Sequence, residues 1–510
     1  MLLLGDILRR HAIVRGDKWA YAIGDAQLTY GEFHLRANQL ARALRRSGVR
    51  RGDRVAILAG NRVEYPLVYF AAIRLGAIVV PINARFTAGE VRYVVEHAEA
   101  ETLIAAGELA ALIETARADG GLRSVRRYLR LDASGAGESL GDLSAAETAD
   151  DIGADVDEHD PHVILYTSGT TGSPKGTVLS QRSYFLQAML SHQQLGLGED
   201  DVGLSMFPMF HMGGWALPLG FWHSGASVAI LAKADARALL DAVARRRVTY
   251  FYAVPTVFDA LLALPDFASF DLGSLRLIGS GTAPLSAARV QRIRARFGNP
   301  AMVILYGSTE AGPVSVLRPA DVARKPETVG RPYLDVDVRL VDAQGAAVPR
   351  DRVGEVAVRS ECTMQSYWRN PDETARTKCD GWVRTGDLGA WDDEGFLSIV
   401  GRSKDVIRSG GESLFPVEIE RVLLAHPDIR DAAVVGVPHE QWGEAAVAVV
   451  VRRDGATLDA ADVVQHVRAH LAAYKRPRHV VFLDTLPRTA ASQQVHKPLL
   501  REQVLQILAR

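Results

Sequence analysis

Short apolar runs alternate with amphipathic segments over most of the chain. An apolar run bounded by turn residues is typical of a buried strand, and apolar positions three or four residues apart are typical of a helix. Their alternation predicts an α/β fold of layered α/β subdomains with much parallel sheet. The expected strands are residues 55–58, 163–166, 227–231, 248–254 and 302–306, and the clearest expected helices are 30–46 and 236–247.

The pattern changes twice in the last third of the chain. From about residue 336, in the segments VDVRLVD and GEVAVRS, apolar and polar residues alternate, which predicts a half-exposed antiparallel sheet and so a β-rich subdomain. Beyond residue 401, a Gly-Gly turn and Pro416 precede a new set of elements. We therefore expect a large N-terminal domain at 1–400, a hinge at 401–404 and a small α+β C-terminal domain at 405–510. The expected elements of the small domain are a helix at 417–426, strands at 432–437 and 445–453, and a helix at 463–474.

Composition narrows the class of protein. In 510 residues, Lys and Arg total 59 and Asp and Glu total 60, so the net charge of −1 provides no basic field for nucleic acid, and an anionic ligand must be held locally. The first residues, MLLLGDILRR, are too short an apolar run for a signal peptide or a membrane span. Two cysteines, Cys362 and Cys379, make no disulfide scaffold. We expect a cytoplasmic protein without a membrane span. The Gly-, Ala- and acid-rich segment 133–160 predicts a solvated surface loop.

A loop with the chemistry of phosphate binding follows the expected strand at 163–166. Residues 167–176 read TSGTTGSPKG and contain three glycines, five hydroxyl residues and one lysine. Such a loop can turn many backbone N–H groups and hydroxyls toward one anion. Its position directly after a buried strand argues against a flexible linker. The candidate ligand-binding residues here are Thr167, Ser168, Gly169, Thr170, Thr171, Gly172 and Lys175.

This loop resembles the signature loop of the adenylate-forming superfamily, which includes acyl-CoA synthetases, luciferases and peptide-synthetase adenylation domains. The resemblance covers essentially the whole chain, because further motifs follow in the family's order. They are PMFHMGG around His211, GSGTAPLS from Gly279, YGSTE at 306–310, GWVRTGDL at 381–388 and GRSKD at 401–405.

The resemblance implies roles for single residues. His211 faces the acyl-carboxylate pocket, Glu310 holds Mg²⁺ and Asp387 binds the ribose hydroxyls. Carboxylate attack on a phosphate requires such charge neutralisation, and Mg²⁺ favours carboxylate and phosphate oxygens. The alternatives are structural: a core histidine, a buried glutamate and a turn-forming aspartate. The resemblance assigns nucleotide contacts to Ser280, Gly281, Thr282, Ala283, Tyr306, Gly307, Ser308, Thr309 and Arg402, and an acyl-pocket wall to Met212, Trp215 and Gly279.

One segment departs from the family's pattern. The family reads P-R-T-x-[ST]-G-K-[VI], and its lysine reaches the carboxylate and phosphate oxygens during adenylation. Residues 487–497 read PRTAASQQVHK here, so Gln494 replaces that lysine and one residue is inserted. Loss of one preorganised donor costs ~10²–10³ in rate, and a neutral amide neutralises less negative charge than an ammonium. Lys497 matches the family's second lysine, and a three-residue slip that would let it compensate is the alternative.

The residues for the second step of the family's reaction remain. Gly410 and Gly411 resemble the turn that lines the CoA tunnel, where a side chain would fill a narrow channel. Lys404 occupies the hinge, about which the resemblance implies that the small domain rotates between the two steps. Lys475 either meets a CoA phosphate or is solvated.

We therefore predict an acyl-CoA ligase that forms a CoA thioester from a preformed acyl-adenylate, with adenylation weakened or lost. Its partners would be CoA, a small-molecule acid or acyl-adenylate, and a separate adenylating enzyme, in bacterial secondary metabolism. Three alternatives stay open: a complete ligase that uses ATP and Mg²⁺, acyl transfer to a carrier-protein thiol, and a non-catalytic adenylate-binding protein. The apolar, glycine-rich pocket wall fits a fatty, aryl or alicyclic acid.

Overall fold

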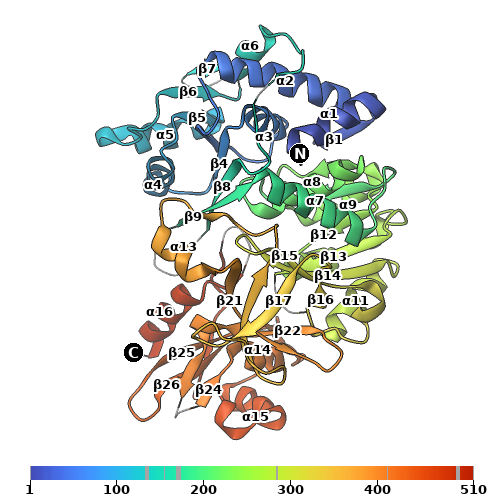
Figure 1. The fold of residues 1–510 in the computed structure, drawn as a ribbon. Helices are drawn as coiled ribbons and strands as arrows, with labels where there is room; N and C mark the ends of the chain where they lie inside the picture. Colours follow the sequence, from blue (N-terminus) through green and yellow to red (C-terminus); the bar gives the residue numbers. More distant parts are fainter. Residues whose placement is uncertain are drawn as a thin grey trace.

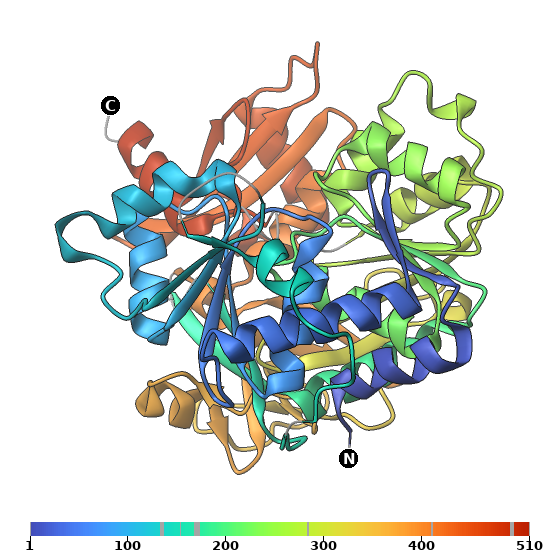
Figure 2. The same cartoon turned by 90° about the horizontal axis from the view of Figure 1, so that it is seen from above.

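The computed structural model describes residues 2–132, 137–153, 155–167, 174–282, 285–409, 412–489 and 494–508. Two large, mostly parallel sheets form the upper part of the molecule, and the C-terminal elements lie below them, coloured orange to red (Figure 1). A view from above places the two chain ends on opposite sides (Figure 2). None of the described helices is long and apolar enough to cross a membrane.

The first large sheet has, among the described residues, the strand order β16-β15-β14-β13-β12-β10-β11-β1-β2. Strands β1 and β10 to β14 run parallel, and antiparallel strands complete both edges. The strands are β1 (Trp19–Ile23), β2 (Ala26–Thr29), β10 (Val202–Ser205), β11 (Ser227–Ile230), β12 (Tyr250–Tyr252), β13 (Leu277–Gly281), β14 (Ala301–Ser308), β15 (Gly312–Leu317) and β16 (Arg331–Pro332).

The second large sheet has the order β19-β9-β8-β4-β3-β5-β6-β7 within the described part of the chain. It is parallel from β8 to β7, and β9 and β19 are added antiparallel at one edge. The strands are β3 (Arg54–Leu58), β4 (Ile78–Ile82), β5 (Thr102–Ala105), β6 (Arg127–Arg130), β7 (Glu138–Ser139), β8 (Pro161–Thr167), β9 (Lys175–Ser180) and β19 (Ser366–Tyr367).

Helices cover these two sheets, as the alternating pattern predicts for α/β layers. The N-terminal domain holds α1 (Leu4–Arg15), α2 (Tyr30–Arg46), α3 (Glu64–Leu75), α4 (Ala88–Ala98), α5 (Ala110–Arg117), α6 (Leu140–Ala145), α7 (Gln181–Leu195), α8 (Met212–Ser224), α9 (Ala236–Arg246), α10 (Pro255–Leu262), α11 (Ala287–Arg296), α12 (Pro319–Val322) and α13 (Pro371–Thr377).

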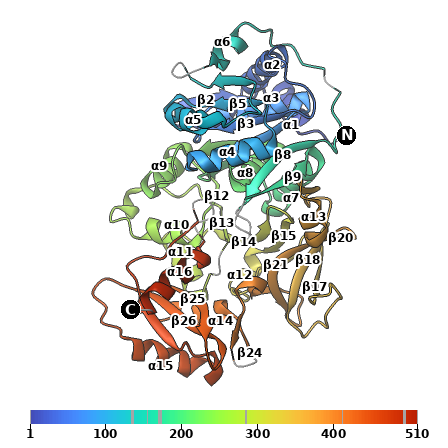
Figure 3. The ribbon, with the colours of Figure 1, turned by 90° about the vertical axis from the view of Figure 1, so that its left-hand side faces the viewer.

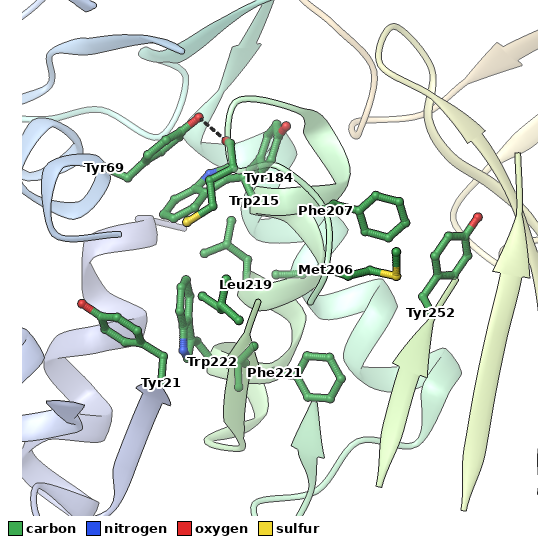
Figure 4. Close-up of a cluster of buried hydrophobic side chains, with 14 of the residues drawn as sticks. Tyr21, Tyr69, Tyr184, Met206, Phe207, Trp215, Leu219, Phe221, Trp222 and Tyr252 are labelled. Carbon is green, nitrogen blue, oxygen red and sulfur yellow. Dashed lines mark hydrogen bonds between the residues drawn. The ribbon is translucent and has the colours of Figure 1, made fainter. Parts of the chain in front are cut away.

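An aromatic cluster fills the space between α8, α3 and the first large sheet (Figure 4). Trp215 and Trp222 of α8 are fully buried, and Trp215 stacks on Tyr69 with ring centroids 3.9 Å apart. Buried aromatic side chains each remove a large apolar area from water, which is the dominant favourable contribution to folding. This cluster fixes α8, and therefore His211 at the beginning of α8, relative to both sheets.

The β-rich subdomain is an antiparallel sheet that lies beside the small domain (Figure 3). It is built from β17 (Asp337–Val341), β18 (Gly354–Arg359), β20 (Lys378–Cys379), β21 (Trp382–Trp391) and β22 (Leu397–Arg402). Strand β22 pairs with β21 and ends at Arg402. The chain leaves this sheet there and continues into the small domain.

The small C-terminal domain is a sheet with helices on both faces. Along β25, Val434 packs in one core with α14 and α15, whereas Val435 packs in the other core with α16. Burial on both faces explains why the strand sequence is a continuous apolar run. The elements are β23 (Ile407–Ser409), β24 (Glu412–Leu414), α14 (Pro416–Leu424), β25 (Ile429–His439), β26 (Gly443–Arg452), α15 (Ala460–His470), β27 (His479–Phe482) and α16 (Lys497–Leu508).

The predicted fold class, strands and helices are confirmed, with three local differences. The strand expected at 248–254 is β12, which covers only Tyr250–Tyr252. The helix expected at 463–474 is α15, which ends at His470, because Leu471 is extended and a short 3-10 turn follows. The segment 133–160 is not a loop throughout: Glu138–Ser139 forms an edge strand and Leu140–Ala145 a short helix that Ser139 caps. Cys362 and Cys379 are both free.

Candidate active site

The two ends of the phosphate loop are held as a β-hairpin. Strand β8 ends at Thr167 and β9 begins at Lys175, and these two residues are paired across the antiparallel ladder. This pairing therefore fixes the position of both ends of the loop. Of the predicted loop residues, Thr167 and Lys175 are described, whereas Ser168, Gly169, Thr170, Thr171 and Gly172 lie outside the described residues.

Glu310 lies beside this hairpin base, in the tight turn between β14 and β15. Its Oε1 accepts a hydrogen bond from the Tyr367 hydroxyl at 3.0 Å and one from the Thr167 hydroxyl at 3.4 Å. Tyr367 reaches this position because β19 pairs with β9. A half-buried carboxylate oriented by two hydroxyls has the character of a ligand for a hard cation.

The predicted metal role of Glu310 fits a cation that shares its ligands with phosphate. Among the residues described, no three His, Cys, Asp or Glu side chains come together as a metal cage. Mg²⁺ is commonly held by one or two carboxylates together with substrate phosphates. Glu310 would therefore hold Mg²⁺ only with a bound nucleotide, and the ion would supply positive charge to the phosphate oxygens.

Asp387 forms a second polar centre with Tyr306 and Arg402. The Tyr306 hydroxyl donates to Asp387 Oδ2 at 2.8 Å, and Arg402 Nε lies 3.0 Å from Asp387 Oδ1. Asp387 and Arg402 are directly opposite each other in the β21–β22 ladder. Burial raises the pKa of Asp387, and the Arg402 cation and the Tyr306 hydrogen bond oppose that rise. The structure thus brings together three predicted nucleotide residues from distant parts of the sequence.

His211 begins α8 and acts as its N-cap. Its Nδ1 accepts a hydrogen bond from the backbone N–H of Gly213 at 3.4 Å. Burial lowers the pKa of His211, so the imidazole is neutral near pH 7. The next residue, Met212, is half-buried. A neutral imidazole beside this apolar side chain suits an apolar acyl group better than an acyl group that carries a second carboxylate.

Three predicted ligand contacts are replaced by packing contacts in this structure. Trp215 has no exposed surface and lies in the aromatic core rather than on an open pocket wall. Gly279 is also enclosed, because a Cβ at this position would lie 2.4 Å from the Tyr250 hydroxyl oxygen. The hydroxyl of Ser280 is buried and donates to the backbone carbonyl of Ala253 at 2.9 Å. The structure shows packing contacts at these three positions, and their predicted ligand contacts stay predictions.

Close backbone approach explains the neighbouring glycines. A Cβ at Gly281 would lie 2.2 Å from the Leu305 carbonyl oxygen, and one at Gly307 would lie 2.4 Å from the Gly312 carbonyl oxygen. Thr282 follows with a φ of +65°. Ser308 accepts a hydrogen bond from the Ala311 N–H at 3.1 Å and closes the turn that carries Thr309 and Glu310. Ala283 lies outside the described residues.

Gln494 reaches the N-terminal domain. Its side-chain Nε2 donates to the Thr282 carbonyl oxygen at 2.9 Å, and its backbone carbonyl accepts from the Thr489 N–H at 2.8 Å. Gln494 therefore lies against the turn that follows β13, at the predicted nucleotide contact Thr282. Its partner is a backbone carbonyl rather than an anion.

Lys497 points into the small domain. Its Nζ lies 2.8 Å from Glu420 and 4.0 Å from Asp405, and only 19% of its side chain is exposed. Release of this ammonium would leave two carboxylates without their partner. The structure therefore offers no support for the slip in which Lys497 takes the place of the missing lysine.

Two further predicted lysines occupy the junction and the small domain. Lys404 lies in the turn Ser403–Asp405 between β22 and β23, where desolvation and the neighbouring Arg402 cation lower its pKa. Lys475 forms an ion pair with Glu418 at 2.5 Å. Partial burial is the largest single effect and acts to lower the pKa of Lys475, but the hydrogen bond and charge of Glu418 together with Tyr474 outweigh it, and the pKa is raised. Gly410 and Gly411 lie outside the described residues.

Two residues of the site were missed by sequence reasoning. Tyr367 contacts Glu310, and Glu373 of α13 forms an ion pair with Lys175. No local pattern marks either residue. Tyr367 lies on β19, and Glu373 lies on α13, the element that follows β19. Both reach the site because β19 pairs with β9, a strand about 190 residues earlier in the chain (367 − 177 = 190).

Comparison with known proteins identifies the family of the chain. The model of the AMP-binding enzyme family matches residues 8–368, and that of the AMP-binding enzyme C-terminal domain matches residues 418–492. Indoleacetate–CoA ligase of Aromatoleum aromaticum is 37% identical over 99% of this chain and 98% of its own length. Feruloyl-CoA synthase of an Amycolatopsis species is 37% identical over 96% of this chain and 97% of its own length.

A solved structure extends the agreement to the fold. The anthranilate CoA ligase AuaEII in complex with anthranoyl-AMP superimposes with a TM-score of 0.92, at 31% identity over 100% of this chain and 98% of that protein. The chain therefore belongs to the AMP-binding enzyme family, within the superfamily of adenylate-forming enzymes.

Proposed function

We propose that the chain is an acyl-CoA ligase, and that it is specialised for the transfer of an acyl group from a preformed acyl-adenylate to CoA. Acyl-CoA ligation is supported by the family and by the names of the relatives. The specialisation is carried by one observation, the hydrogen bond of Gln494 to the Thr282 carbonyl in place of a lysine that could meet two anions.

The two half-reactions place different demands on the site. Adenylation brings a carboxylate to the α-phosphate of ATP, so negative charge concentrates and a cation is valuable. In thioesterification the CoA sulfur bonds to the acyl carbonyl carbon, the bond from that carbon to the phosphate oxygen breaks, AMP leaves and the thiol proton passes to solvent. The second step requires the adenylate to be held, a role for Asp387, Tyr306 and Arg402.

Gln494 and Lys497 together explain why adenylation would suffer more than thioesterification. Gln494 offers a dipole and no net charge, and Lys497 is held by Glu420 and Asp405. Loss of one charged donor costs ~10²–10³ in rate or more when the charge that it neutralises develops in the transition state. An enzyme that receives the adenylate ready-made does not incur this loss. The acyl-adenylate would then come from a separate adenylating enzyme, as in a divided pathway of secondary metabolism.

A complete ligase that uses ATP and Mg²⁺ is the second candidate. It is favoured by the names of the relatives and by the retained carboxylate at Glu310 beside the phosphate-loop base. Under this candidate Gln494 would be a tolerated replacement, and adenylation would proceed on the charges of the metal and the loop.

The acyl group is proposed to be apolar and of aryl, alicyclic or fatty type. Neutral His211 and half-buried Met212 argue for this class, and relatives named for indoleacetate and feruloyl groups agree with it. The acceptor is proposed to be CoA rather than a carrier-protein thiol. This choice rests on the names of the relatives, indoleacetate–CoA ligase and feruloyl-CoA synthase. Lys475 adds no support to it, because it is paired with Glu418 in this domain orientation.

A split assay on the full chain distinguishes the candidates. ATP, Mg²⁺ and a panel of aryl and fatty acids are supplied without CoA, and pyrophosphate release is measured. Synthetic acyl-adenylates of the same acids are supplied separately with CoA or with a phosphopantetheinylated carrier protein, and thioester is measured. Thioester from adenylate with little pyrophosphate supports the specialised enzyme. Pyrophosphate release as fast as thioester formation establishes the complete ligase, and the absence of thioester with any acyl-adenylate and either acceptor contradicts both.

A further inference from the structure

Lys175, the single lysine of the phosphate loop, is engaged by a carboxylate. Its ammonium forms an ion pair with Glu373 of α13, and only 11% and 16% of the two side chains are exposed. The Glu373 carboxylate uses its other oxygen to accept hydrogen bonds from Arg376, at 2.6 Å and 2.9 Å. Lys175 lowers the pKa of Glu373, so the carboxylate is ionised at neutral pH.

Neighbouring groups fix the orientation of this pair. Asn370 caps α13 and accepts a hydrogen bond from the Glu373 N–H at 3.1 Å. The Lys175 ammonium also lies 5.5 Å from the centre of the Tyr367 ring, and the hydroxyl of the same ring donates to Glu310. Both oxygens of Glu373 and one face of Lys175 are therefore occupied by protein groups.

We propose that Glu373 is a positioning residue that determines which phosphate ligand the site prefers, because it neutralises Lys175 and so disfavours ATP relative to an adenylate. This inference rests on the proposed function. In a site that must hold only one phosphate, a neutralised loop lysine removes the main attraction for the β- and γ-phosphates. The adenosine and its single phosphate are held elsewhere, at Asp387, Tyr306 and Arg402.

The charges support this reading. Lys175 and Arg376 carry one positive charge each, and Glu373 carries one negative charge, so the group of three has one uncompensated positive charge. We place this charge on Arg376, whose side chain is 70% exposed and well screened by solvent. Lys175 is half-buried, as Glu373 is, and its charge is balanced at contact distance. A triphosphate must either bind without this cation or displace Glu373, and both alternatives cost affinity for ATP and not for AMP.

The test compares nucleotide affinities in matched variants of the full chain. Glu373→Gln removes the carboxylate charge and preserves the shape of the side chain. Asp372→Asn makes the same change of charge on the adjacent, exposed residue and serves as the control. Dissociation constants for ATP with Mg²⁺ and for AMP are measured by calorimetry. We expect Glu373→Gln to lower the ATP constant about tenfold and the AMP constant less than twofold, and Asp372→Asn to change neither.

A second variant keeps the inference testable if Glu373→Gln does not fold. Lys175→Gln combined with Glu373→Gln should change ATP affinity less than twofold, because the pair that is removed carries no net charge. A large loss of ATP affinity in this double variant would overturn the inference, as would an equal gain for ATP and AMP in Glu373→Gln or an equal gain in the Asp372→Asn control. These outcomes are independent of the proposed function, which stands or falls on pyrophosphate and thioester formation by the native chain.

Discussion

The side-chain amide of Gln494 lies 2.9 Å from the carbonyl oxygen of Thr282 and connects the C-terminal domain to the turn that follows β13. Thr282 adopts the left-handed backbone conformation, with a φ of +65°. The backbone of the turn therefore sets the direction in which the Thr282 carbonyl points. An ammonium in place of the amide could bind the same carbonyl and still carry charge for an anion. Gln494 therefore makes a contact between the domains and carries no charge there.

Under the proposed function, Gln494→Lys should raise the rate of adenylation. A lysine side chain is similar in reach and adds one positive charge where two anions would converge, so we expect pyrophosphate release to rise at least tenfold. Thioester formation from acyl-adenylate should change less. The measurement is the initial rate of both half-reactions on the same protein preparation.

Gln441→Lys is the matched control, because Gln441 is exposed on the same domain. An equal rise in this variant would show that a positive charge elsewhere on the same domain has the same effect on pyrophosphate release. The absence of any rise in Gln494→Lys would show that the inserted residue misplaces the ammonium or that Gln494 is not the cause.

Asp387→Asn should weaken adenylate binding. The substitution removes the charge that pairs with Arg402 and retains a side chain of the same size, so we expect the dissociation constant for AMP to rise about tenfold to a hundredfold. Calorimetric titration of AMP measures it. Asp335→Asn, a change of an exposed aspartate in the β-rich region, should leave the constant unchanged. Normal AMP affinity in Asp387→Asn would contradict the assignment of Asp387 to the nucleotide.

The parts of the site that could be predicted from sequence are those in which local pattern and chemistry coincide. The phosphate loop directly follows β8, and Tyr306 directly precedes the turn with Glu310, so each motif could be read with its own strand. Helix α2 was predicted with its bounds because its apolar face and its Thr29 cap are local features.

The parts that could not be predicted depend on contacts between distant segments. The partners of Glu310 and Lys175 come from a two-residue strand and a seven-residue helix far along the chain, which leave no periodic signal. Trp215 was assigned to the acyl pocket by the family resemblance, whereas the fold places its ring in the aromatic core, stacked on Tyr69. Likewise, only the fold shows that Lys497 meets Glu420.

Acid should destabilise the N-terminal domain through His162. This side chain is fully buried, its Nδ1 lies 3.1 Å from the Leu179 carbonyl oxygen, and burial lowers its pKa from 6.5 to about 3. Below pH 6.5 the unfolded chain binds a proton that the folded chain does not, so stability falls as the pH is lowered from 6.5 toward 3. This residue alone would contribute a slope of at most about 1.4 kcal/mol per pH unit.

Urea unfolding of the native chain and of His162→Asn at pH 7 and pH 5 measures this effect. The native chain should lose more stability than the variant between the two values of pH. His159→Asn changes an exposed histidine and should behave as the native chain does. Equal losses in the native chain and in His162→Asn would show that His162 is not the group that titrates.

Tyr367→Phe tests the link between the candidate metal carboxylate and the phosphate loop. The variant keeps the ring that lies beside Lys175 and removes the hydroxyl that donates to Glu310 at 3.0 Å. Without this donor, one orienting contact of the carboxylate is lost, and outer contacts of this kind typically change metal affinity by about 10- to 100-fold. We therefore expect the Mg²⁺ concentration that gives half-maximal enhancement of ATP binding to rise about tenfold, while ATP binding without Mg²⁺ is unchanged. Tyr128→Phe, a half-buried tyrosine on β6, is the control. A loss of ATP affinity that is equal with and without Mg²⁺ would instead mean that the hydroxyl maintains the packing of β19 against β9, because such a defect would not depend on the ion.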